Sequence, residues 1–187
     1  LPLVRSINVS GHKYGLCYAG IGWAIWKSPK YLPEELIFNV NYLGSDQASF
    51  TLNFSKSAAP IIAQYYVLIR LGRAGFTAIM NNLMDVSRNL ADRLEKTGKF
   101  TILSDRTGNG LPLVAFRLAA KDIHYDEFDV AQKLRERGWI VPAYTMAPHT
   151  EHIKLLRIVV REDFSQSRCD GLITDILCTL DQLDQLD

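Results

Sequence analysis

The chain has 187 residues, of which 48% are hydrophobic types and 22% are charged, so it carries enough apolar material to bury a core. This composition excludes an intrinsically disordered or low-complexity chain. Its 21 lysines and arginines balance 20 aspartates and glutamates, which leaves a net charge of +1. Because no overall positive field is present, we expect neither a nucleic-acid partner nor an anionic membrane partner.

The cysteines and the hydropathy pattern bear on location. Cys17, Cys169 and Cys178 are an odd number without the spacing of a disulfide framework, which favours a reducing compartment. No window approaches the roughly 18 apolar residues of a membrane span, and residues 1–10 lack the pattern of a signal peptide. We therefore expect a cytoplasmic chain. Since it begins at Leu1 rather than at methionine, we also expect it to be a piece of a longer protein.

The first part of the chain predicts two pairs of strands followed by helices. Branched apolar residues over 3–9 and a second β-rich run over 16–26 flank a short turn at 10–15. Residues 36–43 and 50–54 predict a hairpin around the turn formers Gly44, Ser45 and Asp46. From residue 58 the apolar period becomes helical, with a break allowed at Gly72 and Gly75 and an end at Gly98.

The rest of the chain alternates strands with helices. Strands are expected at 100–103, 113–118, 139–144 and 155–160, with amphipathic helices at 126–137 and 166–186. This order is typical of an α+β unit, and we place the boundary between two domains near residue 80.

The turn at residues 10–15 (SGHKYG) carries the side chains with the most specific chemistry. It places a hydroxyl (Ser10), an imidazole (His12) and an amine (Lys13) between two glycines. A lysine can bond covalently to an aldehyde when its surroundings keep the amine neutral, while Ser10 and His12 can donate hydrogen bonds to a phosphate. On the residues alone, a lysine and a histidine in a turn between strands are more often ordinary surface residues.

A second cluster, at His149 and His152, superficially looks like a metal pair. It follows Pro148 in a loop and lacks a convincing third ligand, so we expect no metal site.

Several segments together resemble the pyridoxal-phosphate-dependent glutamate decarboxylases of bacteria, plants and fungi. The cofactor-lysine segment is 6–15 (SINVSGHKYG), and the order and spacing of the later segments are also similar. These later segments are 22–26 (GWAIW), 32–40 (LPEELIFNV), 42–44 (YLG), 53–55 (NFS), 62–66 (IAQYY), 70–73 (RLGR), 137–145 (RGWIVPAYT) and 156–158 (LRI).

The resemblance implies an α/β fold of the fold-type I class of pyridoxal-phosphate enzymes. Residues 1–80 would be the end of the cofactor-binding large domain, with the cofactor lysine, an active-site hairpin and a linking helix. Residues 81–187 would be the C-terminal α+β small domain. Because the usual subunit of this family is far longer, the N-terminal half of the large domain would be missing, and with it the partner of the pyridine nitrogen.

The resemblance also implies a role for each site residue. Lys13 would bond covalently to pyridoxal 5'-phosphate, and Ser10 and His12 would bind its phosphate. Ser55 would reach the phosphate of a neighbouring subunit, which implies at least a homodimer with shared sites. Tyr42 would lie on a mobile hairpin and donate a proton after carbon dioxide leaves, and Arg157 would bind the substrate α-carboxylate.

Each of the last three roles has a simpler alternative on the residues alone. Ser55 could be the N-cap of the helix that begins near residue 58. Tyr42 could be an ordinary hairpin aromatic, and Arg157 could be an outward strand residue that pairs with a surface carboxylate.

The implied function is α-decarboxylation of L-glutamate to 4-aminobutyrate and carbon dioxide, and we expect this chain to be inactive alone. One alternative is a decarboxylase of another amino acid, since side-chain specificity would be set in the missing half. Another is a truncated, non-enzymatic relative. We see no basic, aromatic segment of the calmodulin-binding kind after the last helix.

Overall fold

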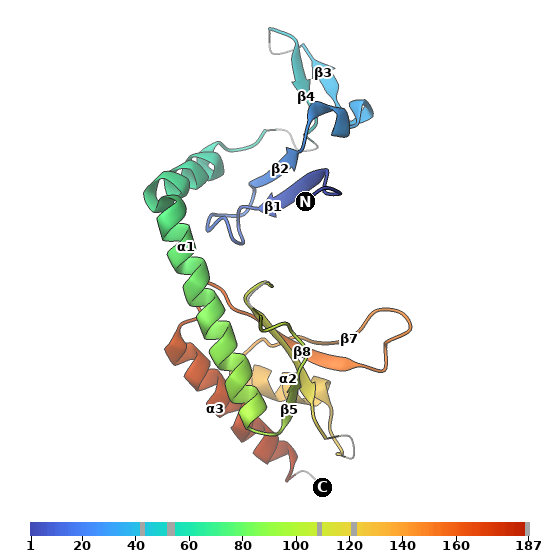
Figure 1. The fold of residues 1–187 in the computed structure, drawn as a ribbon, viewed down its shortest axis with the longest axis vertical. Helices are drawn as coiled ribbons and strands as arrows, with labels where there is room; N and C mark the ends of the chain where they lie inside the picture. The colour runs from blue at the N-terminus through green and yellow to red at the C-terminus, as the bar shows by residue number, and fades with distance from the viewer. Residues whose placement is uncertain (42–43, 52–54, 108–109, 121–122, 186–187) are drawn as a thin grey trace. The chain divides into compact units, whose positions relative to one another are not determined.

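The computed structural model describes residues 1–41, 44–51, 55–107, 110–120 and 123–185. The chain divides into two compact units, Leu1–Gly75 and Phe76–Asp187 (Figure 1). The boundary expected near residue 80 falls inside α1 (Ala59–Lys96), a helix that contributes residues to both units.

The first unit begins with an antiparallel hairpin. β1 (Ser6–Ser10) pairs with β2 (Gly22–Trp26), with Ser10 opposite Gly22. The prediction that the second strand starts at residue 16 is wrong, because residues 11–21 form no strand and include turns at 11–15 and 19–20. Their amides bond locally instead of in a strand ladder: the Cys17 amide donates to the Gly11 carbonyl at 3.0 Å, and the Lys13 amide donates to the Ser10 carbonyl at the end of β1. The apolar residues of this segment therefore imitate a strand in the sequence alone.

A second hairpin follows two short 3₁₀ turns, η1 (Pro29–Tyr31) and η2 (Glu34–Leu36). It consists of β3 (Phe38–Val40) and β4 (Gln47–Ser49), with Val40 opposite Gln47. The hairpin itself is confirmed, but its second strand lies at Gln47–Ser49, before the predicted 50–54. Phe50 instead packs edge-on against Trp26, with ring centroids 5.6 Å apart. Residues 42–43 and 52–54 of the predicted strands lie outside the described ranges.

The predicted break in the long helix is confirmed at one glycine. Gly72 in α1 has φ 53° and ψ −167°, which lies outside the helical region and is accessible to glycine at little cost. The helix ends where the sequence indicates, because Gly98 adopts φ 72° just beyond the last turn.

The second unit contains a four-stranded antiparallel sheet in the order β5-β6-β8-β7. Its strands are β5 (Phe100–Ile102), β6 (Leu113–Leu118), β7 (Ala143–Thr145) and β8 (Lys154–Val159). The prediction of a strand over 139–144 is largely wrong. The Trp139 amide donates to Leu134 at the end of the preceding helix, and Pro142 has no amide to pair.

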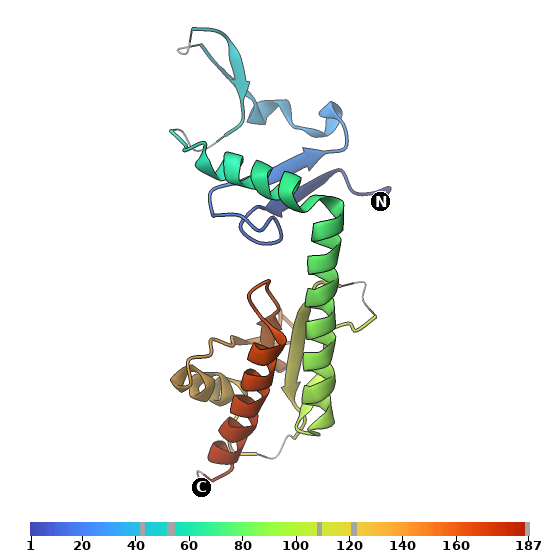
Figure 2. The same cartoon turned by 90° about the vertical axis from the view of Figure 1, so that its left-hand side faces the viewer.

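Two helices complete this unit, α2 (Glu127–Glu136) and α3 (Gln166–Leu183). Asp126 caps α2 by accepting hydrogen bonds from the amides of Phe128 and Asp129. Helices α1 and α3 lie side by side (Figure 2), joined by a salt bridge between Arg93 and Asp170.

The core of the described residues lies in the second unit. Every hydrophobic side chain that is buried in the described ranges falls between Leu83 and Leu183. Those that are 0% exposed are Leu90, Leu94, Phe116, Val130, Leu134, Leu156, Val160, Cys169 and Ile176. In the first unit, by contrast, Ile7 and Ile25 of the β1–β2 hairpin are 51% and 54% exposed.

Candidate functional site

Three of the predicted site residues lie together on one turn of the first unit. Ser10 is the last residue of β1 and is half-buried, while His12 and Lys13 are exposed on the turn that follows. The Lys13 amide donates to the Ser10 carbonyl at 3.2 Å, and the Leu16 amide donates to the Lys13 carbonyl at 3.1 Å. We call residues 10–17 the Lys13 turn. Within this turn Lys13 directly follows His12 and stands three residues after Ser10, so its amine, the imidazole and the hydroxyl all extend from one backbone-bonded turn.

The two glycines of this turn are required by close packing rather than by unusual dihedral angles. A Cβ on Gly15 would lie 2.6 Å from Oε1 of Gln64 and 2.6 Å from the Gly11 carbonyl oxygen. A Cβ on Gly11 would lie 2.9 Å from the same Gln64 oxygen and 2.7 Å from the Ile21 side chain. Contacts below 3.0 Å are not tolerated by carbon, so the Gln64 amide takes the space of both missing side chains.

Helix α1 contacts the Lys13 turn at two points. The Gln64 Nε2 donates to the Gly15 carbonyl at 2.9 Å. The Cys17 thiol donates to the Pro60 carbonyl, with the sulfur 3.5 Å from the oxygen.

Burial raises the pKa of the Tyr14 phenol, within the Lys13 turn, above its ordinary value of 10.0, so this side chain stays neutral at physiological pH.

The remaining predicted residues of the first unit are placed less fully. Tyr42 lies outside the described residues. Ser55 adopts φ 56°, an uncommon left-handed conformation for a residue with a side chain. The alternative of Ser55 as the helix cap is wrong, because it is Ser57 whose hydroxyl accepts from the Ala59 amide, at 3.1 Å.

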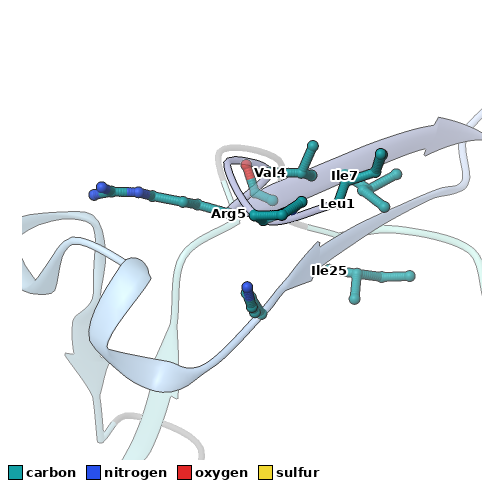
Figure 3. A pocket seen from close by; sticks show the side chains of 8 residues that line it. Leu1, Val4, Arg5, Ile7 and Ile25 are labelled. Carbon is teal, nitrogen blue, oxygen red and sulfur yellow. The ribbon is translucent and has the colours of Figure 1, made fainter.

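A hollow of about 720 Å³ lies beside the β1–β2 hairpin and is lined mostly by apolar side chains. Leu1 and Val4 line it from the segment before β1, Ile7 from β1 and Ile25 from β2 (Figure 3). The predicted site residues that fall within the described ranges, Ser10, His12, Lys13, Ser55 and Arg157, do not line this hollow.

Arg157 belongs to the second unit, where it projects from β8 opposite Ala115 of β6. Its guanidinium carbon lies 5.4 Å from the ring centroid of Tyr144 on β7, in a cation–π contact. The side chain is exposed, and among the described residues it forms no salt bridge. The alternative of a surface ion pair is therefore not met within the described ranges, and the guanidinium keeps its charge available.

Within the described ranges, no helix is long and apolar enough to cross a membrane. In the same ranges, no three histidine, cysteine, aspartate or glutamate side chains are grouped so that they could hold a metal ion.

Comparison with known families places the Lys13 turn in context. The conserved domain of pyridoxal-dependent decarboxylases matches residues 1–119, which include the whole first unit and the first strands of the second. The chain belongs to the pyridoxal-dependent decarboxylase family. The cofactor of the family is pyridoxal phosphate, and the resemblance found in the sequence is confirmed.

Relatives within this family cover the whole chain. It is 55% identical over 186 residues to the glutamate decarboxylase of Petunia hybrida, and 55% identical to glutamate decarboxylase 1 of Arabidopsis thaliana. It is 43% identical over 184 residues to glutamate decarboxylase beta of Listeria monocytogenes, with 98% of this chain and 39% of the relative covered. All of this chain matches only 37% of the Petunia protein and 36% of the Arabidopsis protein.

Solved structures confirm the fold. Glutamate decarboxylase from Lactobacillus brevis matches 100% of this chain with a TM-score of 0.90 and 41% identity, and 42% of that structure is covered. Tryptophan decarboxylase from Catharanthus roseus matches 96% of this chain and 39% of its own with a TM-score of 0.76, at 17% identity, which supports the fold alone. This pyridoxal-dependent decarboxylase chain therefore has the fold-type I architecture that its sequence predicts.

Gln64 is the main residue in contact with the Lys13 turn that the sequence did not indicate. It is a polar residue within an apolar helical run, IIAQYYV at 61–67, and it lies in the segment 62–66 that resembles the glutamate decarboxylases, but neither feature indicates its contact. Its contact with Gly15 spans 49 residues, so only the structure shows it.

Proposed function

We propose that this chain is the cofactor-lysine segment and small domain of a glutamate decarboxylase. The observation that carries the proposal is the Lys13 turn, which groups an amine, an imidazole and a hydroxyl on a backbone packed against Gln64. This turn occurs in a chain 55% identical to plant glutamate decarboxylases. By comparison, the tryptophan decarboxylase of Catharanthus roseus is 17% identical to this chain.

The side chains of the turn fit pyridoxal phosphate chemically. Lys13 is the one amine of the turn, and its exposure allows an aldehyde to reach it. The hydroxyl of Ser10 and the imidazole of His12 are donors suited to phosphate oxygens. The glycine packing against Gln64 supports the fit, because it fixes the backbone from which all three side chains extend.

The proposed division of work follows from these residues. Lys13 holds the cofactor covalently, while Ser10 and His12 bind its phosphate. Pyridoxal phosphate, when bound, supplies an electron-poor ring that accepts the electron pair of the broken bond. Arg157 binds the α-carboxylate through its planar guanidinium and so fixes which bond of the substrate is oriented for cleavage.

The overall reaction balances with one proton. The bond between Cα and the α-carboxylate of L-glutamate breaks, carbon dioxide leaves, and Cα takes up a proton to give 4-aminobutyrate. We propose Tyr42 as the donor of that proton, since a phenol is a competent general acid when it is positioned near the reacting carbon.

The assembly and the location of the enzyme are also part of the proposal. We propose that Ser55 binds the cofactor phosphate of a neighbouring subunit, so that two copies share each site. Its left-handed φ of 56° supports a special role, because such strain persists where the surrounding structure demands it. A cytoplasmic location agrees with three free cysteines.

The activity test uses a hybrid enzyme in which this chain replaces the matching 186 residues of the Petunia relative. We expect the hybrid to release carbon dioxide and 4-aminobutyrate from L-glutamate, and Lys13→Ala to abolish this release. Lys27→Ala, on the same hairpin but outside the turn, is the matched control and should keep activity. A folded hybrid that acts on another amino acid in preference to glutamate would contradict the proposed substrate.

A further inference from the structure

We infer that Gln64 is a positioning residue for Lys13, acting through the hydrogen bond from its amide to the Gly15 carbonyl. The inference rests on the proposed function, because Lys13 must be the cofactor lysine for its position to matter. Gln64 touches neither the cofactor nor the substrate in this proposal. It acts on the turn from the opposite side, through helix α1.

The first support is the burial pattern of α1. Gln64 is only 1% exposed, although it is the polar residue of its run. Its neighbours on the same face of the helix, Pro60, Ala63 and Val67, are half-buried, whereas Ile62 and Tyr65 on other faces are each 66% exposed. Gln64 is thus a polar side chain at the centre of the face of α1 that packs on the Lys13 turn. Gln64 is therefore buried for its own contact, which is the Lys13 turn.

The second support is that one side chain contacts both ends of the turn. Gly11 and Gly15 stand two residues before and two residues after Lys13. The Gln64 oxygen occupies the space that a Cβ on either glycine would need, and its nitrogen bonds to Gly15. The position of Lys13 between these two contacts is fixed by the same amide.

The third support is that stability alone does not favour glutamine here. Its Oε1 is buried and has no hydrogen-bond partner among the described residues. A buried acceptor without a partner is unfavourable, whereas methionine has a similar length and no such acceptor. The amide is therefore better explained by the specific bond that its nitrogen donates to Gly15.

A second contact keeps the turn attached when this bond is removed. Cys17 still donates from its thiol to the Pro60 carbonyl at the start of α1. We therefore expect Gln64→Met to leave the hairpin folded and to loosen the turn locally. This expectation separates a positioning role from a role in overall folding.

The first experiment measures amide hydrogen exchange in this chain. Three backbone amides report on the turn: those of Lys13, Leu16 and Cys17, which donate to carbonyls within it. Loss of one buried hydrogen bond should speed their exchange by about fivefold in Gln64→Met. Gln132→Met, on the exposed side of α2, makes the same chemical change elsewhere and should leave these amides unchanged.

The second experiment measures covalent labelling of Lys13 in the hybrid enzyme. Pyridoxal phosphate is added at increasing concentrations, the protein is reduced with borohydride, and the labelled peptides are quantified by mass spectrometry. We expect the concentration for half-labelling of Lys13 to rise about fivefold in Gln64→Met, matching the loss of one hydrogen bond. Circular dichroism checks that the variants are folded. If Gln64→Met does not fold, Gln64→Leu is used as a second apolar replacement.

The outcomes separate this inference from the proposed function. If the parent hybrid is labelled on Lys13 and both Gln64 variants are labelled equally well, the positioning role is overturned and the proposed function stands. Faster exchange with unchanged labelling also overturns it, since that is the signature of a purely structural contact. If the folded parent hybrid takes no label on Lys13, the proposed function fails and the inference fails with it.

Discussion

The packing of Gly15 leads to a sharp prediction about the Lys13 turn. In Gly15→Ala the new methyl group would lie 2.6 Å from Oε1 of Gln64, 2.6 Å from the Gly11 carbonyl oxygen and 2.7 Å from the Gly11 Cα. Two of these three atoms belong to the backbone, so a change of rotamer cannot relieve the overlap. The turn must shift away from α1 or lose the hydrogen bond from Gln64.

The size of the effect follows from these contacts. Forcing a methyl group into a filled space costs about 1–3 kcal/mol. Loss of the bond between Gln64 and Gly15 adds about 1 kcal/mol. Alanine also lowers the conformational entropy of the unfolded chain, which stabilises the folded turn by only about 0.4–1 kcal/mol. We therefore expect the turn to open more easily by about 2 kcal/mol, which corresponds to roughly thirtyfold faster exchange of its amides.

The assay is amide hydrogen exchange on this chain, with Gly110→Ala as the matched control. A Cβ on Gly110 meets no atom of the described residues within 4 Å, so that variant should exchange like the parent. The amides of Lys13, Leu16 and Cys17 should be the ones affected in Gly15→Ala. Unchanged exchange at these three amides would refute the packing of the turn against Gln64.

Three further predictions test the second unit. Leu90→Ala removes a side chain that is 0% exposed, so it should lower the free energy of unfolding by about 2–5 kcal/mol and the melting temperature by roughly 10 °C or more. The control, Ile140→Ala, removes a side chain that is 75% exposed and should change the melting temperature little. Equal losses in a thermal melt would contradict the assigned core. Tyr125 donates to Asp184 at 2.7 Å; burial and this bond raise the pKa of Tyr125 to about 12, and the bond lowers the pKa of Asp184. The lowered pKa of Asp184 gives stability that is lost as the pH falls below about 4, and the raised pKa of Tyr125 gives stability that is lost as the pH rises from about 10 towards 12. Tyr125→Phe should therefore lower the melting temperature at pH 7, and should lower it less at pH 3. If the difference in melting temperature between parent and variant does not vary with pH, the hydrogen bond between Tyr125 and Asp184 is contradicted. In the hybrid enzyme, Arg157→Ala should reduce kcat/KM for glutamate by about 10–100-fold, the effect of losing a charge-assisted hydrogen bond. Arg161→Ala, another exposed arginine of the same unit, is its control, and equal kcat/KM in the two variants would exclude Arg157 from carboxylate binding.

Much of the fold could be predicted because local chemistry determines it. Gly72 interrupts α1 at the residue where the sequence allows a break, and Gly98 ends the helix. Asp126 precedes α2 by one residue and caps it through its carboxylate. The strand at Leu113–Leu118 has the predicted bounds, because its branched apolar residues lie in the middle of a sheet.

The errors arose where backbone partners lie elsewhere in the chain. Residues 16–21 contain apolar side chains that resemble a strand, but Cys17 bonds back to Gly11 within the turn. The role of Gln64 depends on a contact with Gly15 that no local pattern reveals. The grouping of Ser10, His12 and Lys13 was evident from the sequence, since three residues of one turn must lie close together. Their roles, and those of Ser55 and Arg157, remain predictions.

The most direct test of the central claim is borohydride trapping on the hybrid enzyme at a single saturating concentration of pyridoxal phosphate. We predict one phosphopyridoxyl group per chain, located on the peptide that contains Lys13. Lys27 and Lys30, which belong to the same unit, should remain unlabelled. A label spread over several lysines, or one absent from Lys13 in a folded hybrid, would contradict the assignment of Lys13 as the cofactor lysine.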